Sequence, residues 1–131
     1  FSEILDIASR ESAGYSPELD KYLEMAATGT LDDFDLDEGL TATELGSIGY
    51  TLKAMGAGFW SLKNAQSYRD GVLQVIHEGG DADTNGAVVG AILGAKFGFA
   101  NIPTIWVTEL RDANELDARV TRMLELLGLA G

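Results

Sequence analysis

Glycines set at helical spacing inside apolar segments constrain the fold of this chain more than any other feature. Gly86, Gly90 and Gly94 recur every four residues in an apolar stretch, so they share one face of a helix. Glycine inside a helix costs about 1 kcal/mol relative to alanine. Such a stripe therefore indicates that another backbone comes close, and it predicts helices packed tightly against one another.

Apolar residues recur every three or four positions along most of the chain, which is the period of an amphipathic helix. Candidate N-caps accompany several of these segments, among them Ser16 before Pro17, Ser67 and Asp112. No stretch shows the strong two-residue alternation that indicates a strand. We therefore predict an all-α fold, a helical bundle of about five to seven helices in a single domain or half-domain over residues 1–131. The expected helical segments are 1–12, 16–26, 41–65, 67–78, 83–97 and 112–127.

The segment from residue 29 to residue 40 breaks the helical pattern and concentrates negative charge. It carries Asp32, Asp33, Asp35, Asp37 and Glu38. Blocks of like charge usually stay solvated, which favours an acidic linker over residues 29–40. The alternative is a second cation site, although the spacing of these carboxylates matches no metal-binding template.

The charge of the chain excludes several classes of partner. The formal net charge is −12 and no cluster of Lys or Arg occurs, so neither nucleic acid nor an anionic membrane surface is an expected partner. The apolar run that begins at Gly86 ends at Lys96. This run is too short to span a bilayer. No secretory signal is recognised, so we expect a cytoplasmic location. The chain has no cysteine, which excludes thiolate metal sites.

The sequence GGDADTNG, residues 79–86, is the strongest candidate for chemistry. Read from Asp81, it matches the opening of a calcium-binding EF-hand loop. That loop needs a bidentate Glu at its twelfth position, which is Ile92 here, within an apolar helical segment. The sequence therefore does not support an EF-hand.

Two interpretations of this turn remain open from the residues alone. Asp at the start of a helix accepts backbone hydrogen bonds and interacts favourably with the helix dipole, so Asp81 and Asp83 are candidate caps. Alternatively, Asp81, Asp83 and Thr84 offer hard oxygen ligands, which suit magnesium, manganese or calcium. Two carboxylates beside a hydroxyl concentrate more negative charge than capping requires.

The sequence around the turn resembles a known family. The segment EGGDADTNGAVVGAILGAKFGFANIPTIWVTEL is similar to the C-terminal signature of the ADP-ribosylglycohydrolase family, and IGYTLKAMGAGFWSL is similar to the helix that precedes this signature. The residues that match the signature in order are Gly79, Gly80, Asp81, Asp83, Thr84, Asn85, Gly90, Gly94, Gly98, Ile102, Pro103 and Trp106.

The resemblance implies the C-terminal half of an all-α fold, with residues 41–110 as the region that carries the metal-binding turn. It implies two magnesium or manganese ions side by side, with Asp81, Asp83 and Thr84 among their ligands. Asp81 and Asp83 would act in catalysis through the metal. The implied reaction is hydrolysis of the glycosidic bond at the ribose anomeric carbon of ADP-ribosylated substrates.

The resemblance also implies a binding region for an ADP-ribose-type ligand. By their position in the helix that precedes the signature, Ser47, Gly49 and Tyr50 are the candidate substrate-binding residues. Tyr50 has an alternative interpretation as a core aromatic, because aromatic residues at helical spacing usually pack inside.

Two metal-binding motifs of the family's N-terminal half, a GDALG-like turn and a Thr/Ser-Asp-Asp sequence, are not found in the 131 residues. We therefore expect about half of the metal site, either empty or half-occupied, in a fragment, a split protein or a degenerate relative. Expected partners are a second copy of the chain or a missing N-terminal half. The alternative function is that of a non-catalytic relative or fragment acting as an oligomerising helical module.

Overall fold

The computed structural model describes residues 1–37 and 49–129. Within these residues the regular structure consists of seven α-helices and two short 3₁₀ helices, without a strand. This confirms the prediction of an all-α helical protein. The chain divides into two compact units, Phe1–Asn101 and Ile102–Gly131. The expectation of a single domain over the whole chain stays a prediction.

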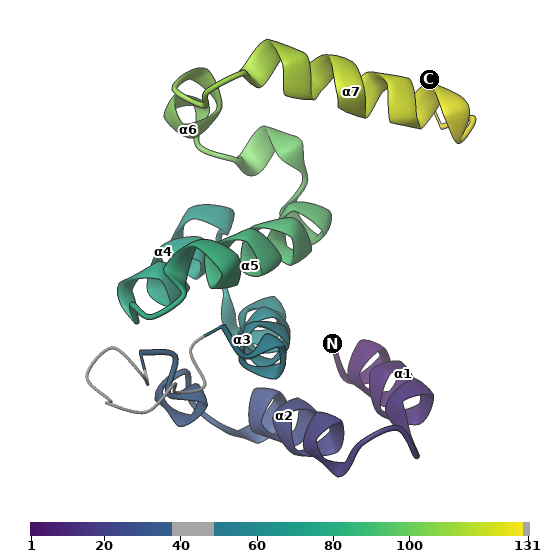
Figure 1. Ribbon diagram of the computed structural model, residues 1–131, viewed down its shortest axis with the longest axis vertical. Helices are drawn as coiled ribbons and strands as arrows, with labels where there is room; N and C mark the ends of the chain where they lie inside the picture. Colours follow the sequence, from purple (N-terminus) through teal and green to yellow (C-terminus); the bar gives the residue numbers. More distant parts are fainter. Residues whose placement is uncertain (38–48, 130–131) are drawn as a thin grey trace. The chain divides into compact units, whose positions relative to one another are not determined.

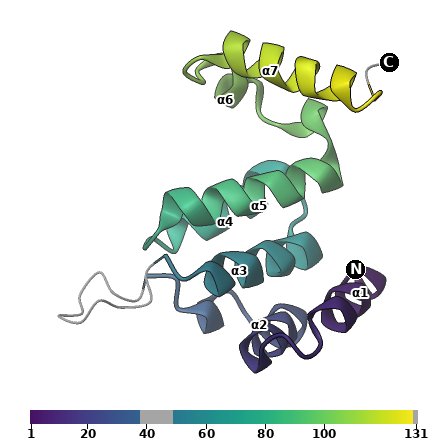
Figure 2. The same cartoon turned by 45° about the vertical axis from the view of Figure 1, so that its right-hand side comes forward.

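The first unit is a layered arrangement of five α-helices. These are α1 (Ser2–Ser12), α2 (Pro17–Thr28), α3 (Thr51–Asn64), α4 (Tyr68–His77) and α5 (Ala82–Phe97). Helix α3 lies between α2 and α5, while α4 packs on α5 and α1 packs on α2 (Figures 1 and 2). The buried apolar side chains come from several of these elements: Leu23, Ala26, Leu31, Phe34, Leu36, Ala54, Ala57, Ala65, Val72, Val75, Val89 and Leu93.

Glycines permit the close packing of α3 against its neighbours. A Cβ atom on Gly58 would lie 2.5 Å from Ile92 Cδ1 of α5, and a Cβ atom on Gly56 would overlap the ring of Phe34. The stripe Gly86, Gly90 and Gly94 makes looser contacts, which are with side chains of α4 rather than with a backbone. Glycines therefore permit close packing, but the closest approaches lie outside the predicted stripe.

The acidic segment is anchored in the core of the first unit. Leu31, Phe34 and Leu36 have exposed fractions of 7%, 1% and 3%, and a short 3₁₀ helix, η1 (Asp32–Phe34), carries two of the acidic residues. The Asp side chains between residues 32 and 37 are exposed, as expected for a charge block. The chain therefore keeps these carboxylates in solvent while it buries the apolar side chains between them.

The helix expected over residues 41–65 differs from the structure at its start. Residues 41–48 lie outside the described part of the chain, and α3 begins at Thr51. Gly49 has a φ of 75°, in the left-handed region that favours glycine, and Tyr50 is extended. These two residues therefore form the turn that precedes α3 instead of continuing a helix through it.

Lysine side chains stabilise the ends of two helices. Lys96 Nζ donates to the carbonyl oxygens of Leu62 and Ala65, each at 2.9 Å, where α3 ends. Lys63 Nζ donates to the Ala27 carbonyl oxygen near the end of α2. The last carbonyls of a helix have no partner within the helix, and a cation there also interacts favourably with the helix dipole.

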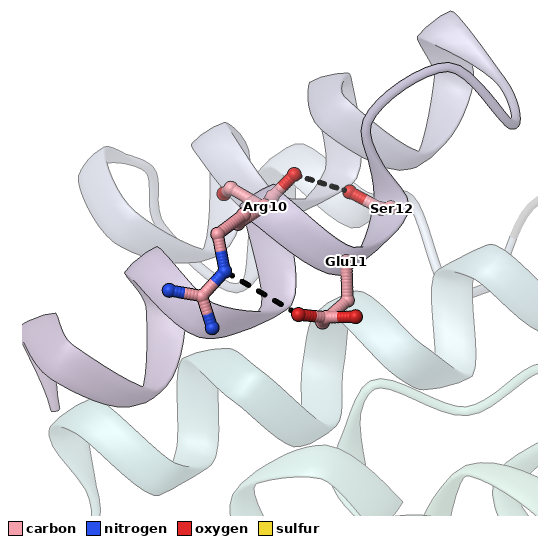
Figure 3. A network of polar contacts seen from close by, with 4 residues as sticks. Arg10, Glu11 and Ser12 are labelled. Carbon is pink, nitrogen blue, oxygen red and sulfur yellow. Dashed lines mark hydrogen bonds and ion pairs between the residues drawn. The ribbon is translucent and has the colours of Figure 1, made fainter.

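The polar contacts of α1 are at its exposed surface. Figure 3 shows Arg10 Nε donating to Glu11 Oε1 at 3.3 Å and Ser12 Oγ donating to a backbone carbonyl oxygen, that of Ser9. About 70% of each side chain of the Arg10–Glu11 pair is exposed. Because solvent screens such pairs, they contribute little to stability, and α1 depends mainly on its contacts with α2.

The second unit contains α6 (Thr104–Thr108) and α7 (Ala113–Leu126), and none of its described residues is buried. Arg119 and Glu115 form an ion pair between successive turns of α7. In the part of the chain that the structure describes, no helix is both long and apolar enough to cross a membrane. The expected cytoplasmic location stays a prediction.

Ser61 provides a test of the core packing. Its side chain is fully buried, and its Oγ atom has no hydrogen-bond partner among the described residues. A buried hydroxyl without a partner is destabilising, so Ser61→Ala should raise the free energy of unfolding by about 1 kcal/mol. As a matched control, Ser67→Ala removes the Oγ atom that accepts the Asp70 N–H at 3.1 Å, and it should lower this energy by about 1 kcal/mol. Urea denaturation measures both, and a loss of stability in Ser61→Ala would contradict this account.

Candidate metal-binding site

The sequence GGDADT forms the corner between α4 and α5. Gly79 and Gly80 have φ angles of 81° and 62°, a conformation that glycine adopts without steric cost. This requirement explains the double glycine. Helix α5 starts at Ala82, so Asp81 is its N-cap residue, and Asp83 and Thr84 lie in its first turn. All three predicted ligands are therefore at the same end of one helix.

The electrostatics of this corner connect its two carboxyl groups. Asp81 makes no side-chain capping hydrogen bond to α5, so it does not act as a cap through its carboxylate. A side-chain hydrogen bond with Asp81 lowers the pKa of Asp83, and hydrogen bonds from the backbone N–H groups of Thr84 and Asp83 lower it further. Two ionised carboxylates in contact repel each other, and a shared proton or a bound cation relieves the repulsion.

The turn before α3 lies beside the Asp81 carboxylate. A Cβ atom on Gly49 would be 3.2 Å from Asp81 Oδ2. The structure therefore brings one of the three predicted substrate-binding residues next to a predicted metal ligand. Ser47, another of the three, lies outside the described residues.

Tyr50, the third predicted substrate-binding residue, is connected to α2. Its hydroxyl donates to Glu18 Oε2 at 2.6 Å, and its ring packs edge-on against Tyr22 with 6.0 Å between ring centroids. The hydrogen bond to Glu18 raises the pKa of Tyr50, because the phenol proton is held by a carboxylate. The side chain is half-buried. Its hydroxyl thus has a structural partner, and its part in substrate binding stays a prediction.

A third segment completes the corner, and the sequence analysis did not find it. A Cβ atom on Gly80 would overlap the Leu36 carbonyl oxygen and would lie 3.1 Å from Asp37 Cα. The backbone of the acidic segment therefore lies directly against the turn that carries the candidate metal ligands. The sequence did contain a sign that this segment is partly buried. Apolar residues interrupt its charge block and thus indicate a buried anchor: Leu31, Phe34 and Leu36.

The oxygen atoms of the corner suit a hard cation. Asp81 is half-buried, and Asp83 and Thr84 are exposed, so these donors are open to solvent. Magnesium usually keeps several water ligands and binds through one or two carboxylates, which this donor set provides. Across residues 1–37 and 49–129, no group of three or more Asp, Glu or His side chains is placed to hold a metal. The described residues therefore fit part of a metal site.

Comparison with known proteins connects the chain to a family. The family model described as ADP-ribosylglycohydrolase matches residues 1–130. The chain is 36% identical to an ADP-ribosylarginine hydrolase, Tri1, of Serratia proteamaculans over 67 residues, which is 51% of this chain and 18% of that protein. It is 35% identical to the ADP-ribosyl-[dinitrogen reductase] glycohydrolase of Rhodospirillum rubrum over 65 residues, or 48% of this chain and 22% of that protein.

A third relative is an uncharacterised protein of Archaeoglobus fulgidus. It is 34% identical over 92 residues, which is 70% of this chain and 30% of that protein. The chain thus spans less than a third of the length of the relatives it matches. No solved structure gives a significant match.

Gly49 offers a test of how much space lies beside the Asp81 carboxylate. Gly49→Ala should lower the free energy of unfolding by about 1–2 kcal/mol through backbone strain at positive φ, and further through crowding against the Asp81 carboxylate. Gly14→Ala is the matched control, because Gly14 also has a positive φ, 89°, but an added Cβ atom there would meet nothing within 4 Å. Chemical denaturation compares the two variants. Equal losses of stability would show that the Asp81 carboxylate leaves room for a side chain at this position.

Proposed function

The chain belongs to the ADP-ribosylglycohydrolase family, and on this basis we propose that it contributes to hydrolysis of the glycosidic bond between ADP-ribose and a modified protein. Asp81, Asp83 and Thr84 are the proposed ligands of magnesium or manganese. The observation that carries the proposal is the placement of Asp81, Asp83 and Thr84 together at the start of α5, directly after the double-glycine turn. A divalent cation shared by these groups offsets their repulsion and uses their oxygen atoms as ligands.

The relatives support the class of substrate. One is named as an ADP-ribosylarginine hydrolase and another as an ADP-ribosyl-[dinitrogen reductase] glycohydrolase. Both names describe hydrolysis of an ADP-ribosylated compound. For this chain we propose a substrate of the same kind, with the scissile bond at the anomeric carbon of the ribose.

Each residue of the corner has a proposed part in this chemistry. Asp81 and Asp83 supply negative charge and Thr84 supplies a neutral oxygen, while Gly49 leaves space beside Asp81 because it has no side chain. The positive end of the dipole of α5 stabilises carboxylates at its start. When bound, the metal would orient ribose hydroxyl groups or a water molecule and make that water a better nucleophile.

The charge of the protein gives the cation a second purpose. With a formal net charge of −12, the chain repels an anionic ligand such as the pyrophosphate of ADP-ribose. Positive charge at the corner reduces this repulsion where the ligand binds. The remaining ligands of a two-metal centre would come from water and from groups outside the described residues. Association with a second copy or with another chain that supplies them is part of the proposal.

Titration calorimetry with Mn²⁺ tests the metal ligands. Asp81→Asn and Asp83→Asn keep the shape of the side chain and remove its charge, so each should weaken Mn²⁺ binding by at least about tenfold. Asp70→Asn is the matched control, because Asp70 also lies in the first turn of a helix, α4, where its exposed carboxylate faces Arg69 at 3.7 Å. This variant should bind Mn²⁺ as the wild type does. Equal affinity in all four proteins would remove the metal ligands from the proposal.

Release of ADP-ribose from an arginine-ADP-ribosylated protein tests the reaction itself. We expect release to require Mn²⁺ or Mg²⁺, to stop on addition of a chelator, and to be lost in Asp81→Asn but not in Asp70→Asn. Release that persists with a chelator would contradict the metal-dependent mechanism. Absence of release by a chain that binds Mn²⁺ normally would favour the alternative, a non-catalytic helical module.

A further inference from the structure

We propose that the backbone segment Asp35–Asp37, named here the strap, positions the Asp81 carboxylate for metal binding, and that Lys53 holds the strap in place. This inference rests on the proposed function, since it concerns the same corner. The strap lies in a segment that the sequence indicates to be an acidic linker, and it contains none of the proposed ligands.

The path of the strap is set by a left-handed residue and a buried side chain. Asp35 has φ 49° and ψ 53°, and it ends the short helix η1. Leu36 then enters the core, with only 3% of its surface exposed. These two features fix the strap against the first unit while the carboxylates of Asp35 and Asp37 stay in solvent.

The strap contacts the turn through backbone atoms. The space in which a Cβ atom of Gly80 would lie is filled by the Leu36 carbonyl group and the Cα atom of Asp37. A side chain can move aside by rotation, but a backbone anchored on both sides cannot. The strap therefore limits where Gly80 can lie. Because the peptide bond between Gly80 and Asp81 is planar, the position of Asp81 is restricted as well. On another side of the Asp81 carboxylate lies Gly49, where an added Cβ atom would be 3.2 Å from Asp81 Oδ2.

Lys53 connects the strap to α3. Its Nζ atom donates to the Asp35 carbonyl oxygen at 2.5 Å, and only 6% of its surface is exposed. Lysine is almost never buried without a compensating partner, because removing its charge from water is costly. Lys63 and Lys96 also donate to backbone carbonyls, but they are exposed. The buried position indicates that the contact between Lys53 and Asp35 holds a particular geometry of the strap.

Two matched pairs of variants separate positioning from simple loss of stability. Lys53→Met removes the ammonium group that holds the strap, and Lys96→Met removes a comparable contact with carbonyls at the other end of α3. Leu36→Ala loosens the anchor of the strap, and Leu23→Ala truncates a leucine in α2 with the same 3% exposure. None of the four substitutions changes a proposed metal ligand.

The measurements are the Mn²⁺ dissociation constant by calorimetry and the unfolding temperature of each variant without metal. We expect Lys53→Met and Leu36→Ala to weaken Mn²⁺ binding by about tenfold, as loss of a supporting residue does at other metal sites. Lys96→Met and Leu23→Ala should lower the unfolding temperature yet keep the wild-type dissociation constant. If Lys53→Met does not fold, the leucine pair decides the question.

The possible failures are distinguishable. Wild-type affinity in both strap variants would overturn the strap and leave the proposed metal ligands intact. Weakening in all four variants in proportion to lost stability would also overturn it, because it would show a general structural effect. Absence of Mn²⁺ binding by the wild type would remove the metal site itself, and with it this inference.

Discussion

The Gly79–Gly80 turn that places Asp81 and Asp83 together at the start of α5 is the constraint on which the rest of this corner depends. Two neighbouring carboxylates repel each other when both are ionised, and a shared proton or a bound cation reduces this repulsion. The Asp81 carboxylate makes no capping hydrogen bond to α5, whereas the Asp83 carboxylate accepts backbone hydrogen bonds. The arrangement therefore differs from an ordinary acidic helix start, in which one carboxylate accepts the first free amides.

Backbone contacts, rather than long side chains, bring the corner together. Gly80 lies against the strap, and Gly49 lies against Asp81, each at a positive φ that other residues rarely adopt. Farther from the corner, α3 packs against its neighbours through further glycines. Small residues thus allow three distant segments of the chain to meet at one point. A substitution at these positions acts on the placement of the carboxylates even though it removes no ligand.

Sequence reasoning found the local features of this protein. The period of the apolar residues predicts the helices, and the motif GGDADT predicts both the turn and the placement of Asp81 and Asp83 at a helix start. These features depend on residues that are close in the sequence, so their physical causes can be read there. The start of α3 was misplaced because Gly49 interrupts a segment whose apolar spacing is otherwise helical.

The contacts between distant segments could not be predicted in the same way. Nothing near Leu36 indicates that its carbonyl group meets Gly80, and nothing near Lys53 indicates that it holds Asp35. Likewise, the stripe of glycines on α5 suggested backbone contact, but the packed structure places side chains of α4 there. Such contacts follow from how whole helices pack, which depends on all of their side chains together.

We propose that the corner formed by Asp81 and Asp83 holds a divalent cation. Electron paramagnetic resonance of Mn²⁺ tests it most directly, because the signal of free aqueous Mn²⁺ weakens when the ion binds to protein. We predict that the wild-type chain removes Mn²⁺ from this signal in proportion to its concentration, and that Asp81→Asn does not. An undiminished signal of free Mn²⁺ in the presence of excess wild-type protein would contradict the account.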